Sequence, residues 1–288
     1  MSSTTTSLRR DAGVSDALAA EFPQFLGEPE FQLAVRLIAD YAGIKLSPHK
    51  RYMVHNRLSR RLRTLGLLSF GDYLRQVQDD PAEREAFVNA LTTNLTAFFR
   101  EPHHFDILHE RALKHRQKES RPLRVWCSAC STGEEAWSIA MTLREAGCAG
   151  EIVASDIDTE ALETASAGLY TTERAASLTP ERMRAHWLRG VGANAGWVSV
   201  RSELRQMVRF AQLNLQSPQW PSTDLYDVVF CRNVVIYFDR EAQKRLLGRF
   251  ATVLRPHGLL LVGHAESFPA GHASFRACGR TSYEFVPN

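Results

Sequence analysis

The residues whose types and spacing point most directly to chemistry lie between positions 125 and 156. An apolar run ends at Cys127, small residues follow as far as Gly133, a pair of glutamates begins at Glu134, and a second apolar run ends at Asp156. Small side chains let the backbone turn tightly and bring its N–H groups and the next helix N-terminus close to a ligand. A strand, turn, helix and strand with an acid at the tip of the second strand is typical of a sheet that binds an adenosine-containing cofactor.

The residues of this turn favour a cationic ligand without phosphate. The separation of Gly133 and Asp156 is close to the roughly 20 residues at which an acid reaches ribose hydroxyls in such units. A dinucleotide turn normally has three glycines, whereas Gly133 is the only glycine here. Glu134 and Glu135 would repel a phosphate and suit a cation and the helix dipole. S-adenosylmethionine therefore fits better than NAD or ATP. The alternative is that the segment is an ordinary buried βαβ unit that binds no ligand and whose glutamates cap the helix.

Composition limits the class of protein. The chain has 288 residues, 44% of them hydrophobic, which is enough for one large or two modest domains with a real core. No stretch approaches 18 consecutive apolar residues, and the Ser/Thr-rich start lacks a signal-peptide core. We therefore expect a cytoplasmic protein without membrane insertion; a monomer is the default expectation. The five cysteines are scattered and odd in number, which argues against a disulfide framework.

Cys127 and Cys130 form a C-x-x-C pair that has two possible chemical uses. A zinc site needs about four ligands, and no second pair with finger spacing is present. A redox dithiol has its first cysteine at a helix N-terminus, whereas Cys127 ends a predicted strand. We interpret both cysteines as small buried side chains and expect no metal.

The first part of the chain is predicted to be helical. Residues 1–27 are rich in Ser, Thr and Ala and are expected to form a flexible tail, and residues 28–91 an all-α domain. Helices are expected to begin near Pro29, Pro48, Ser69 and Pro81. Gly43 is expected to end the first of them.

The second part, residues 92–288, is predicted to be an α/β domain. Short apolar strands are expected at 124–127, 152–155, 208–212, 228–231 and 259–262, and helices at 134–146, 158–168 and 240–254. This alternation predicts a doubly wound, mostly parallel sheet. Gly258 is expected to be the turn residue before the last strand. An insert at about 187–204 interrupts the alternation of strands and helices and is predicted to form a small antiparallel β-subdomain.

Four segments together resemble one family, the CheR-type chemotaxis methyltransferases. They are Leu91-Thr-Thr-Asn-Leu-Thr-Ala-Phe-Phe-Arg100, the turn before Glu134, Ala154-Ser-Asp-Ile-Asp158 and Phe230-Cys-Arg-Asn-Val-Val-Ile-Tyr-Phe-Asp239. The resemblance extends over about residues 30 to 286. It implies a Rossmann-like methyltransferase sheet and transfer of a methyl group from S-adenosylmethionine to glutamates of bacterial chemoreceptors, with S-adenosylhomocysteine as the product.

The resemblance also implies which residues contact the cofactor. They are Asn94, Thr96, Arg100, Glu134, Asp156, Asn214, Leu215, Arg232 and Asn233. Glu134 corresponds to the acid that holds the methionyl ammonium, Asp156 to the ribose acid, and Asn214 and Leu215 to residues beside the adenine. The chain departs from the family at Ala136-Trp137, where Pro-Tyr is usual.

Methyl transfer to a carboxylate needs few catalytic groups, because a glutamate is already ionised at neutral pH and requires no general base. Arg100 and Tyr237 are the residues we expect nearest the reacting groups. The alternatives are an interface ion pair for Arg100 and a core position for Tyr237. Amino-directed methyltransferases typically carry prolines at 232–237, and their absence here favours a carboxylate substrate.

Seven basic residues and no acidic one lie between positions 45 and 63. On a helical wheel Arg57, Arg60 and Arg61 flank the apolar stripe, and we expect Arg57, Arg60 and Arg63 to dock the glutamate-rich methylation helix of a chemoreceptor. The alternatives are a solvated helix face or a nucleic-acid patch. A net charge of only +3 and the lack of an aromatic platform argue against nucleic acid.

The insert at 187–204 resembles the family's β-subdomain, which in some members captures a receptor C-terminal pentapeptide by adding a strand. The alternative is a structural flap. Two other functions also remain open for the chain: an adapter that binds S-adenosylmethionine without catalysis, and a methyltransferase for RNA or a small molecule.

Overall fold

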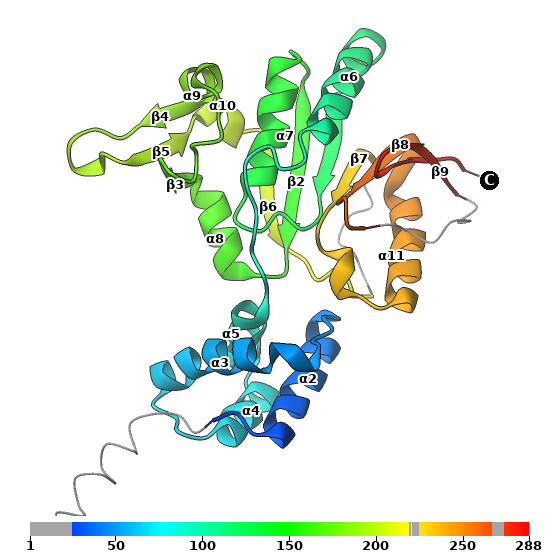
Figure 1. Cartoon of the computed structure of the whole chain (residues 1–288). Helices are drawn as coiled ribbons and strands as arrows, with labels where there is room; N and C mark the ends of the chain where they lie inside the picture. The colour runs from blue at the N-terminus through cyan, green and yellow to red at the C-terminus, as the bar shows by residue number, and fades with distance from the viewer. Residues whose placement is uncertain (1–24, 219, 221–224, 267–273, 288) are drawn as a thin grey trace, which may run out of the picture. The chain divides into compact units, whose positions relative to one another are not determined.

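The computed structural model describes residues 25–218, 220, 225–266 and 274–287 (Figure 1). The predicted N-terminal tail lies almost wholly outside these residues. The chain divides into two compact units: one contains the residues up to Leu37 together with Leu46–Leu91, and the other contains Ile38–Lys45 and the residues from Thr92 onward. Within the described parts of the chain, no helix is long and apolar enough to cross a membrane.

The smaller unit is all-α, as predicted. Its helices are α2 (Glu28–Ala42), whose last turn belongs to the larger unit, α3 (Arg51–Leu65), α4 (Phe70–Asp79) and α5 (Pro81–Leu91), with a single 3-10 turn, η1 (Pro48–Lys50), before α3. Local capping explains two of the boundaries. The Ser69 hydroxyl accepts a hydrogen bond from the Asp72 N–H at the start of α4, and Gly66, with a φ of 67°, ends α3 in the left-handed region.

The core of the smaller unit forms where α3 packs against α4 and α5. Val54, Leu58 and Leu62 recur along one face of α3 and are fully buried. Arg61 lies on the same helix and forms two hydrogen bonds, of 2.7 and 2.6 Å, with the carboxylate of Glu83 on α5. Of the three arginines that flank the apolar stripe, Arg61 therefore points toward α5, where its guanidinium neutralises a carboxylate that is only 3% exposed.

Replacing Arg61 with Met should destabilise the smaller unit by about 3 kcal/mol, because the buried Glu83 carboxylate would lose its charged partner. Chemical denaturation followed by far-UV circular dichroism would measure the loss. Arg60→Met is the matched control, since Arg60 is exposed on the same helix. Equal stabilities of the two variants would contradict a structural role for the pair.

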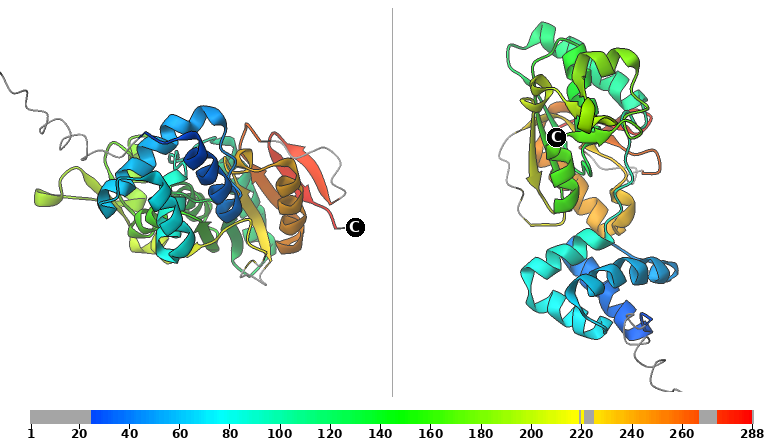
Figure 2. Two further views of the ribbon diagram at one scale, coloured as in Figure 1. Left: turned by 90° about the horizontal axis from the view of Figure 1, so that it is seen from below. Right: turned by 90° about the vertical axis from the view of Figure 1, so that its left-hand side faces the viewer.

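The larger unit is built on a seven-stranded sheet in the order β6-β2-β1-β7-β8-β10-β9. The strands are β1 (Leu123–Cys127), β2 (Gly150–Asp156), β6 (Val208–Gln212), β7 (Tyr226–Cys231), β8 (Leu254–Val262), β9 (Phe275–Gly279) and β10 (Ser282–Phe285). The first five pair in parallel, and β9 and β10 add an antiparallel edge. Figure 2 shows this C-terminal hairpin, in red, at the edge of the sheet beside α11 (Arg240–Val253).

Alternate side chains of the central strands enter two separate cores, which confirms the predicted doubly wound α/β fold. Val125 and Cys127 of β1 pack with α6 (His103–Lys118) and α7 (Glu134–Glu145), whereas Trp126 between them packs with α11. Because both faces are covered, β7 is buried at every position. A further helix, α8 (Thr159–Ala167), follows β2.

The insert forms a second, three-stranded antiparallel sheet in the order β3-β5-β4. It contains β3 (Leu169–Thr171), β4 (Trp187–Arg189) and β5 (Trp197–Val200), with α9 (Pro180–His186) before β4, the turn η2 (Gly192–Asn194) between β4 and β5, and α10 (Ser202–Arg205) after β5. The antiparallel subdomain is confirmed, but β3 lies upstream of the expected range. Three residues are too few to show a period of two.

The turn expected at Gly258 has its left-handed residue at the preceding position. The residue in the left-handed region is His257, with a φ of 61°, and Gly258 lies inside β8. Glycine is needed there because a Cβ would lie 2.8 Å from the carbonyl oxygen of Arg255. The requirement at Gly258 is thus close backbone approach rather than a positive φ.

Candidate cofactor site

The turn between β1 and α7 is fixed at the carboxyl ends of three neighbouring strands. The N–H of Cys130 donates to the Ser155 carbonyl at the end of β2, and the N–H of Ser128 donates to the Phe230 carbonyl in β7, both at 2.9 Å. Gly133 has a φ of 96°, and a Cβ there would lie 2.8 Å from Ala165. The chain therefore requires glycine at the point where the turn enters α7, and this edge of the sheet is where α/β proteins bind ligands.

Asp156 joins the tip of β2 to this turn. Its Oδ2 accepts from the N–H of Ser131 at 2.7 Å and its Oδ1 accepts from the N–H of Asp158 at 3.1 Å. The side chain is largely buried, and burial raises its pKa above the ordinary value. The carboxylate is therefore held at the strand end in one orientation, as a group that receives ribose hydroxyls must be.

Asn94 is brought to the same place by Asp158. Its amide donates to Asp158 Oδ2 at 2.7 Å, the Thr92 hydroxyl donates to the same oxygen at 2.5 Å, and the Ser131 hydroxyl donates to Asn94 Oδ1 at 3.4 Å. The structure thus joins Asn94, Asp156 and the turn in one hydrogen-bonded group. Thr96 follows two residues later and is half-buried.

Glu134, the expected ammonium partner, already has a cationic neighbour. Its side chain is almost fully buried, Oε1 pairs with the guanidinium of Arg174, and Oε2 accepts from the Thr132 hydroxyl at 2.8 Å. Arg174 also donates to Thr132 Oγ1 and lies over the ring of Tyr170. Arg174 lies between β3 and α9 without a recognisable motif, so the sequence analysis missed it.

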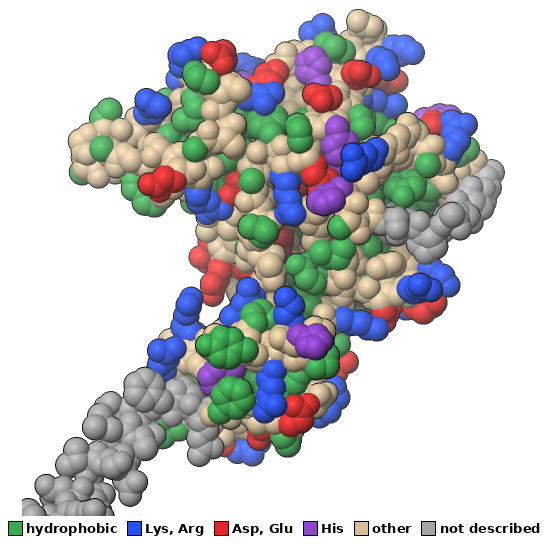
Figure 3. Space-filling view, viewed as in Figure 1, with side chains coloured by type: hydrophobic (Ala, Val, Ile, Leu, Met, Phe, Trp, Pro, Cys, Tyr) green, Lys and Arg blue, Asp and Glu red, His purple; other side chains and the backbone are tan. Residues whose placement is uncertain are grey.

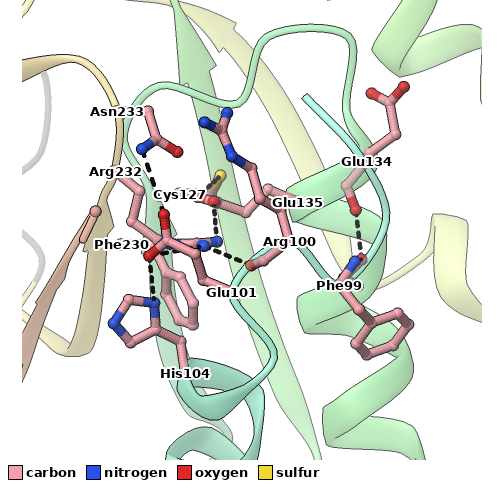
Figure 4. Close-up of polar contacts among 12 residues, drawn as sticks. Phe99, Arg100, Glu101, His104, Cys127, Glu134, Glu135, Phe230, Arg232 and Asn233 are labelled. Atoms are coloured by element: carbon pink, nitrogen blue, oxygen red, sulfur yellow. Dashed lines mark hydrogen bonds and ion pairs between the residues drawn. The ribbon is translucent and has the colours of Figure 1, made fainter. Parts of the chain in front are cut away.

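A second cluster forms around Arg232, at the end of β7 (Figure 4). Arg232 is 4% exposed and pairs with Glu135 at 2.6 Å and with Glu101 at 3.4 Å. It also donates to the carbonyl of Arg100, and Cys127 Sγ contacts Glu135 Oε1 at 3.2 Å. Arg232 is therefore enclosed by protein groups and fixes the segment that contains Arg100.

Glu101 is stabilised as an anion. Burial would raise its pKa, but the hydrogen bonds from His264 and the charge of Arg232 lower it to about 2. Phe99 and Glu101 both have positive φ values, of 52° and 56°, which are uncommon for residues other than glycine. The buried ion pairs hold these unfavourable backbone conformations in place on both sides of Arg100.

The Arg100 side chain itself remains available. Its Nη1 donates to the carbonyl of Leu95 at 2.7 Å. Among the described residues no carboxylate pairs with it, so the structure provides no support for the interface ion pair that we considered. A half-buried guanidinium with a neutral partner is suited to binding a carboxylate from outside.

Glu266 is a second residue that the sequence analysis missed. It is buried, its Oε2 accepts from the N–H groups of Asn233 and Gly263 at 2.8 and 2.7 Å, and its Oε1 accepts from the N–H of Val235 at 2.7 Å. Burial raises the pKa of Glu266. These bonds shape the loop after β7, in which Asn233 has a φ of 58°.

The remaining predicted residues lie apart from these hydrogen-bonded groups. Asn214 donates to the carbonyl of Tyr41 at 2.7 Å, and Leu215 is buried in the core beneath α11. Tyr237 lies in the single turn η3 (Val235–Tyr237), half-buried against the same core. Among the described residues, none of these three side chains forms a hydrogen bond with Glu134 or Asp156.

The departure at Ala136-Trp137 has a clear structural consequence. Both side chains are fully buried in the core between α7 and the sheet. The indole N–H of Trp137 donates to the carbonyl of Ala165 in α8 at 3.2 Å. The aromatic residue therefore holds α7 against α8, and this position contributes to packing.

A doubly wound sheet with an acid at the tip of β2 and a glycine-poor turn followed by two glutamates is typical of the α/β methyltransferase class. Two family models match the chain: the CheR methyltransferase all-alpha domain over residues 29–92 and the CheR methyltransferase SAM binding domain over residues 94–284. The chain belongs to the CheR methyltransferase family.

Relatives match along nearly the whole chain. A chemotaxis protein methyltransferase of Klebsiella aerogenes is 48% identical over 98% of both chains. One from Escherichia coli is 47% identical over 90% of this chain and 91% of its own. Chemotaxis protein methyltransferase 2 of Pseudomonas aeruginosa is 46% identical over 88% of this chain and 92% of its own.

Binding of S-adenosylhomocysteine should weaken as the pH falls into the acidic range, and at a higher pH than for an ordinary aspartate, because burial raises the pKa of Asp156 and a protonated carboxyl accepts ribose hydrogen bonds less well. Isothermal titration across this range would measure the effect. Asp156→Asn should bind at least tenfold more weakly, without this pH dependence. The same pH dependence in the variant would show that another group titrates.

Proposed function

We propose that the chain transfers a methyl group from S-adenosylmethionine to the γ-carboxylate of glutamates on methyl-accepting chemotaxis receptors. The observation that carries the proposal is the match of both parts of the chain to CheR methyltransferase domains, with relatives named chemotaxis protein methyltransferase over nearly their full length. The proposal divides the chain into a docking domain, 28–91, and a catalytic domain, 92–288. It also places the enzyme in the cytoplasm as a monomer.

The charges of the candidate site fit the cofactor. Asp156 is suited to the ribose hydroxyls, and the neighbouring Glu134 and Arg174 offer opposite charges to the ammonium and carboxylate of a methionyl group. Because Glu134 is buried, its carboxylate needs a cationic partner. If a methionyl ammonium replaced Arg174 as that partner, the carboxylate would remain paired. Asn94 and Thr96 complete this side of the site.

The other cofactor-binding residues have supporting roles in the proposal. Asn214 and Leu215 flank the adenine, while Arg232 and Asn233 belong to the segment that follows β7. The ion pairs of Arg232 indicate that it acts on the cofactor through the segment it holds rather than by direct contact. Asn233 follows it in a backbone conformation fixed by Glu266.

Bound S-adenosylmethionine supplies a methyl group activated by a sulfonium. The new bond joins a glutamate oxygen to the methyl carbon as the carbon–sulfur bond breaks, and no proton has to be removed from an ionised carboxylate. Arg100 orients the carboxylate, and Tyr237 lies beside it after β7. Alignment of this kind contributes on the order of 7–11 kcal/mol to lowering a barrier.

Arg100→Ala should lower receptor methyl-ester formation at least tenfold, because the carboxylate would lose its orienting guanidinium, and Tyr237→Phe should lower it less. Transfer of labelled methyl groups to receptor membranes would measure both rates and would separate an enzyme from an inactive adapter. Arg276→Ala and Tyr283→Phe are matched controls, one exposed and one half-buried, near the C-terminal edge of the sheet. Wild-type rates in Arg100→Ala and Tyr237→Phe would contradict their assignment.

The docking part of the proposal rests on α3. Arg60 and Arg63 are exposed one turn apart, and Arg57 is half-buried with Nη1 donating to the carbonyl of Ala90 at 3.4 Å. Figure 3 shows basic side chains beside apolar ones over this helical unit, and Tyr52 of α3 is 69% exposed. Such a mixed surface suits a helix that carries glutamates and apolar residues.

The double variant Arg60→Glu/Arg63→Glu should raise the KM for receptor methylation at low salt at least tenfold, because it reverses two charges that attract glutamates. Affinity for S-adenosylhomocysteine should not change. Arg75→Glu on α4, exposed and outside this surface, is the control. Unchanged methylation kinetics in the double variant would exclude this docking surface.

The β-subdomain supplies a second receptor contact in the proposal, with a C-terminal pentapeptide. β4 is an edge strand, and both Leu188 within it and Val191 just after it are exposed. A pocket of about 640 Å³ adjoins this strand and is lined by Arg184, Arg189 and Arg201 among other residues. An edge strand beside three guanidinium groups suits a peptide that ends in a carboxylate.

A further inference from the structure

A group of metal-ligating side chains includes Glu101 of the Arg232 cluster, and none of its members is assigned a contact with the cofactor or the methyl-accepting glutamate. Glu101, His103 and His104 each offer one ligand atom, and these three atoms lie within 4.8 Å of one another. Two imidazoles and one carboxylate are a ligand set for zinc and similar divalent transition metals. All three residues lie at or just before the start of α6.

The outer nitrogens of the two histidines are held by one hydroxyl. Thr281 Oγ1 lies 2.8 Å from His104 Nε2 and 3.3 Å from His103 Nε2, and its own proton goes to the carbonyl of Arg280 at 2.6 Å. Both rings must therefore donate their Nε2 protons to Thr281. This tautomer leaves the Nδ1 lone pairs free for a metal, which is the arrangement in which metal-binding histidines are normally held.

The inner nitrogen of His104 provides an independent indication of a ligand. His104 is fully buried, and its Nδ1 has no hydrogen-bond partner, although a buried polar atom without one is rare. Glu101 Oε2 lies 3.7 Å away, which is too far for a hydrogen bond and too near for a bridging water. Two ligands of a tetrahedral metal with bonds near 2.1 Å lie about 3.4 Å apart, close to this separation.

The carboxylate of Glu101 supplies the negative charge of the cluster. Glu101 is ionised, and its second oxygen, Oε1, lies 2.8 Å from His264 Nδ1, which orients the carboxylate from outside. Glu101 Oε2 also lies 3.4 Å from Arg232 and accepts from the N–H of His264 at 3.1 Å, while Arg232 makes its shorter ion pair with Glu135 at 2.6 Å. A metal ion would share this oxygen with both groups.

We propose that Glu101, His103 and His104 form a binding site for one divalent transition-metal ion of the zinc type, with His264 and Thr281 as the residues that orient the ligands. The site is separate from the cofactor turn. Its occupancy depends neither on S-adenosylmethionine nor on a receptor.

Cobalt(II) titration of the full chain tests the proposal directly, because cobalt replaces zinc and its visible absorption reports the ligand geometry. The parent protein should carry Cys278→Ser, which removes the exposed thiol, and should be freed of metal with a chelator. One equivalent of cobalt should bind at micromolar concentration, and zinc should displace it. His103→Asn should weaken binding at least tenfold, whereas His109→Asn, a half-buried histidine on the same helix, should not.

Two results would overturn the proposal: no binding of one equivalent by the folded parent, or equal affinity in the parent and His103→Asn. Glu101→Gln gives a second test that does not change the buried His104, and far-UV circular dichroism would verify that each variant is folded. Titration with S-adenosylhomocysteine is a separate measurement, so failure of the cofactor assignment would not affect the cobalt result.

Discussion

The candidate site depends on the ion pairs and the hydrogen bond of one buried guanidinium, that of Arg232. It lies at the end of β7 and is bound to Glu135 in the first turn of α7, to Glu101, and to the carbonyl of Arg100. A buried charge is costly unless its partners satisfy it, so these groups stabilise one another only while all are in place. Three segments that are distant in sequence are thereby held in one arrangement at the carboxyl edge of the sheet.

The same edge explains why the turn contains one glycine and is flanked by acids. Gly133 is required by its positive φ and by the close approach of Ala165, whereas the neighbouring positions carry side chains that hydrogen bond across the turn. A phosphate would need open N–H groups there, but the Ser131 N–H is already bound to Asp156. The arrangement suits a ligand that offers hydroxyls and a positive charge.

The sequence predicted the parts of the fold that depend on local patterns. The strand at 208–212 has its predicted bounds, and Ser69 caps its helix as expected, because apolar runs and caps are short-range signals. The contacts of Arg232 with Glu135 and Arg100 join residues 97 and 132 positions apart, and those of Glu266 with Asn233 join residues 33 apart. Such pairs carry no periodic signal, so Glu101, Arg174 and Glu266 could not be identified before the structure.

Hydrogen exchange of an Arg232→Met variant, compared with the wild type, is the most direct test of the role of this guanidinium. Protection should fall together in 97–101 and in the first turn of α7, since both lose a shared partner. Protection in the β8 and β10 pair should not change, because Arg232 makes no contact there among the described residues. Unchanged protection in the first two segments would contradict the role assigned to Arg232.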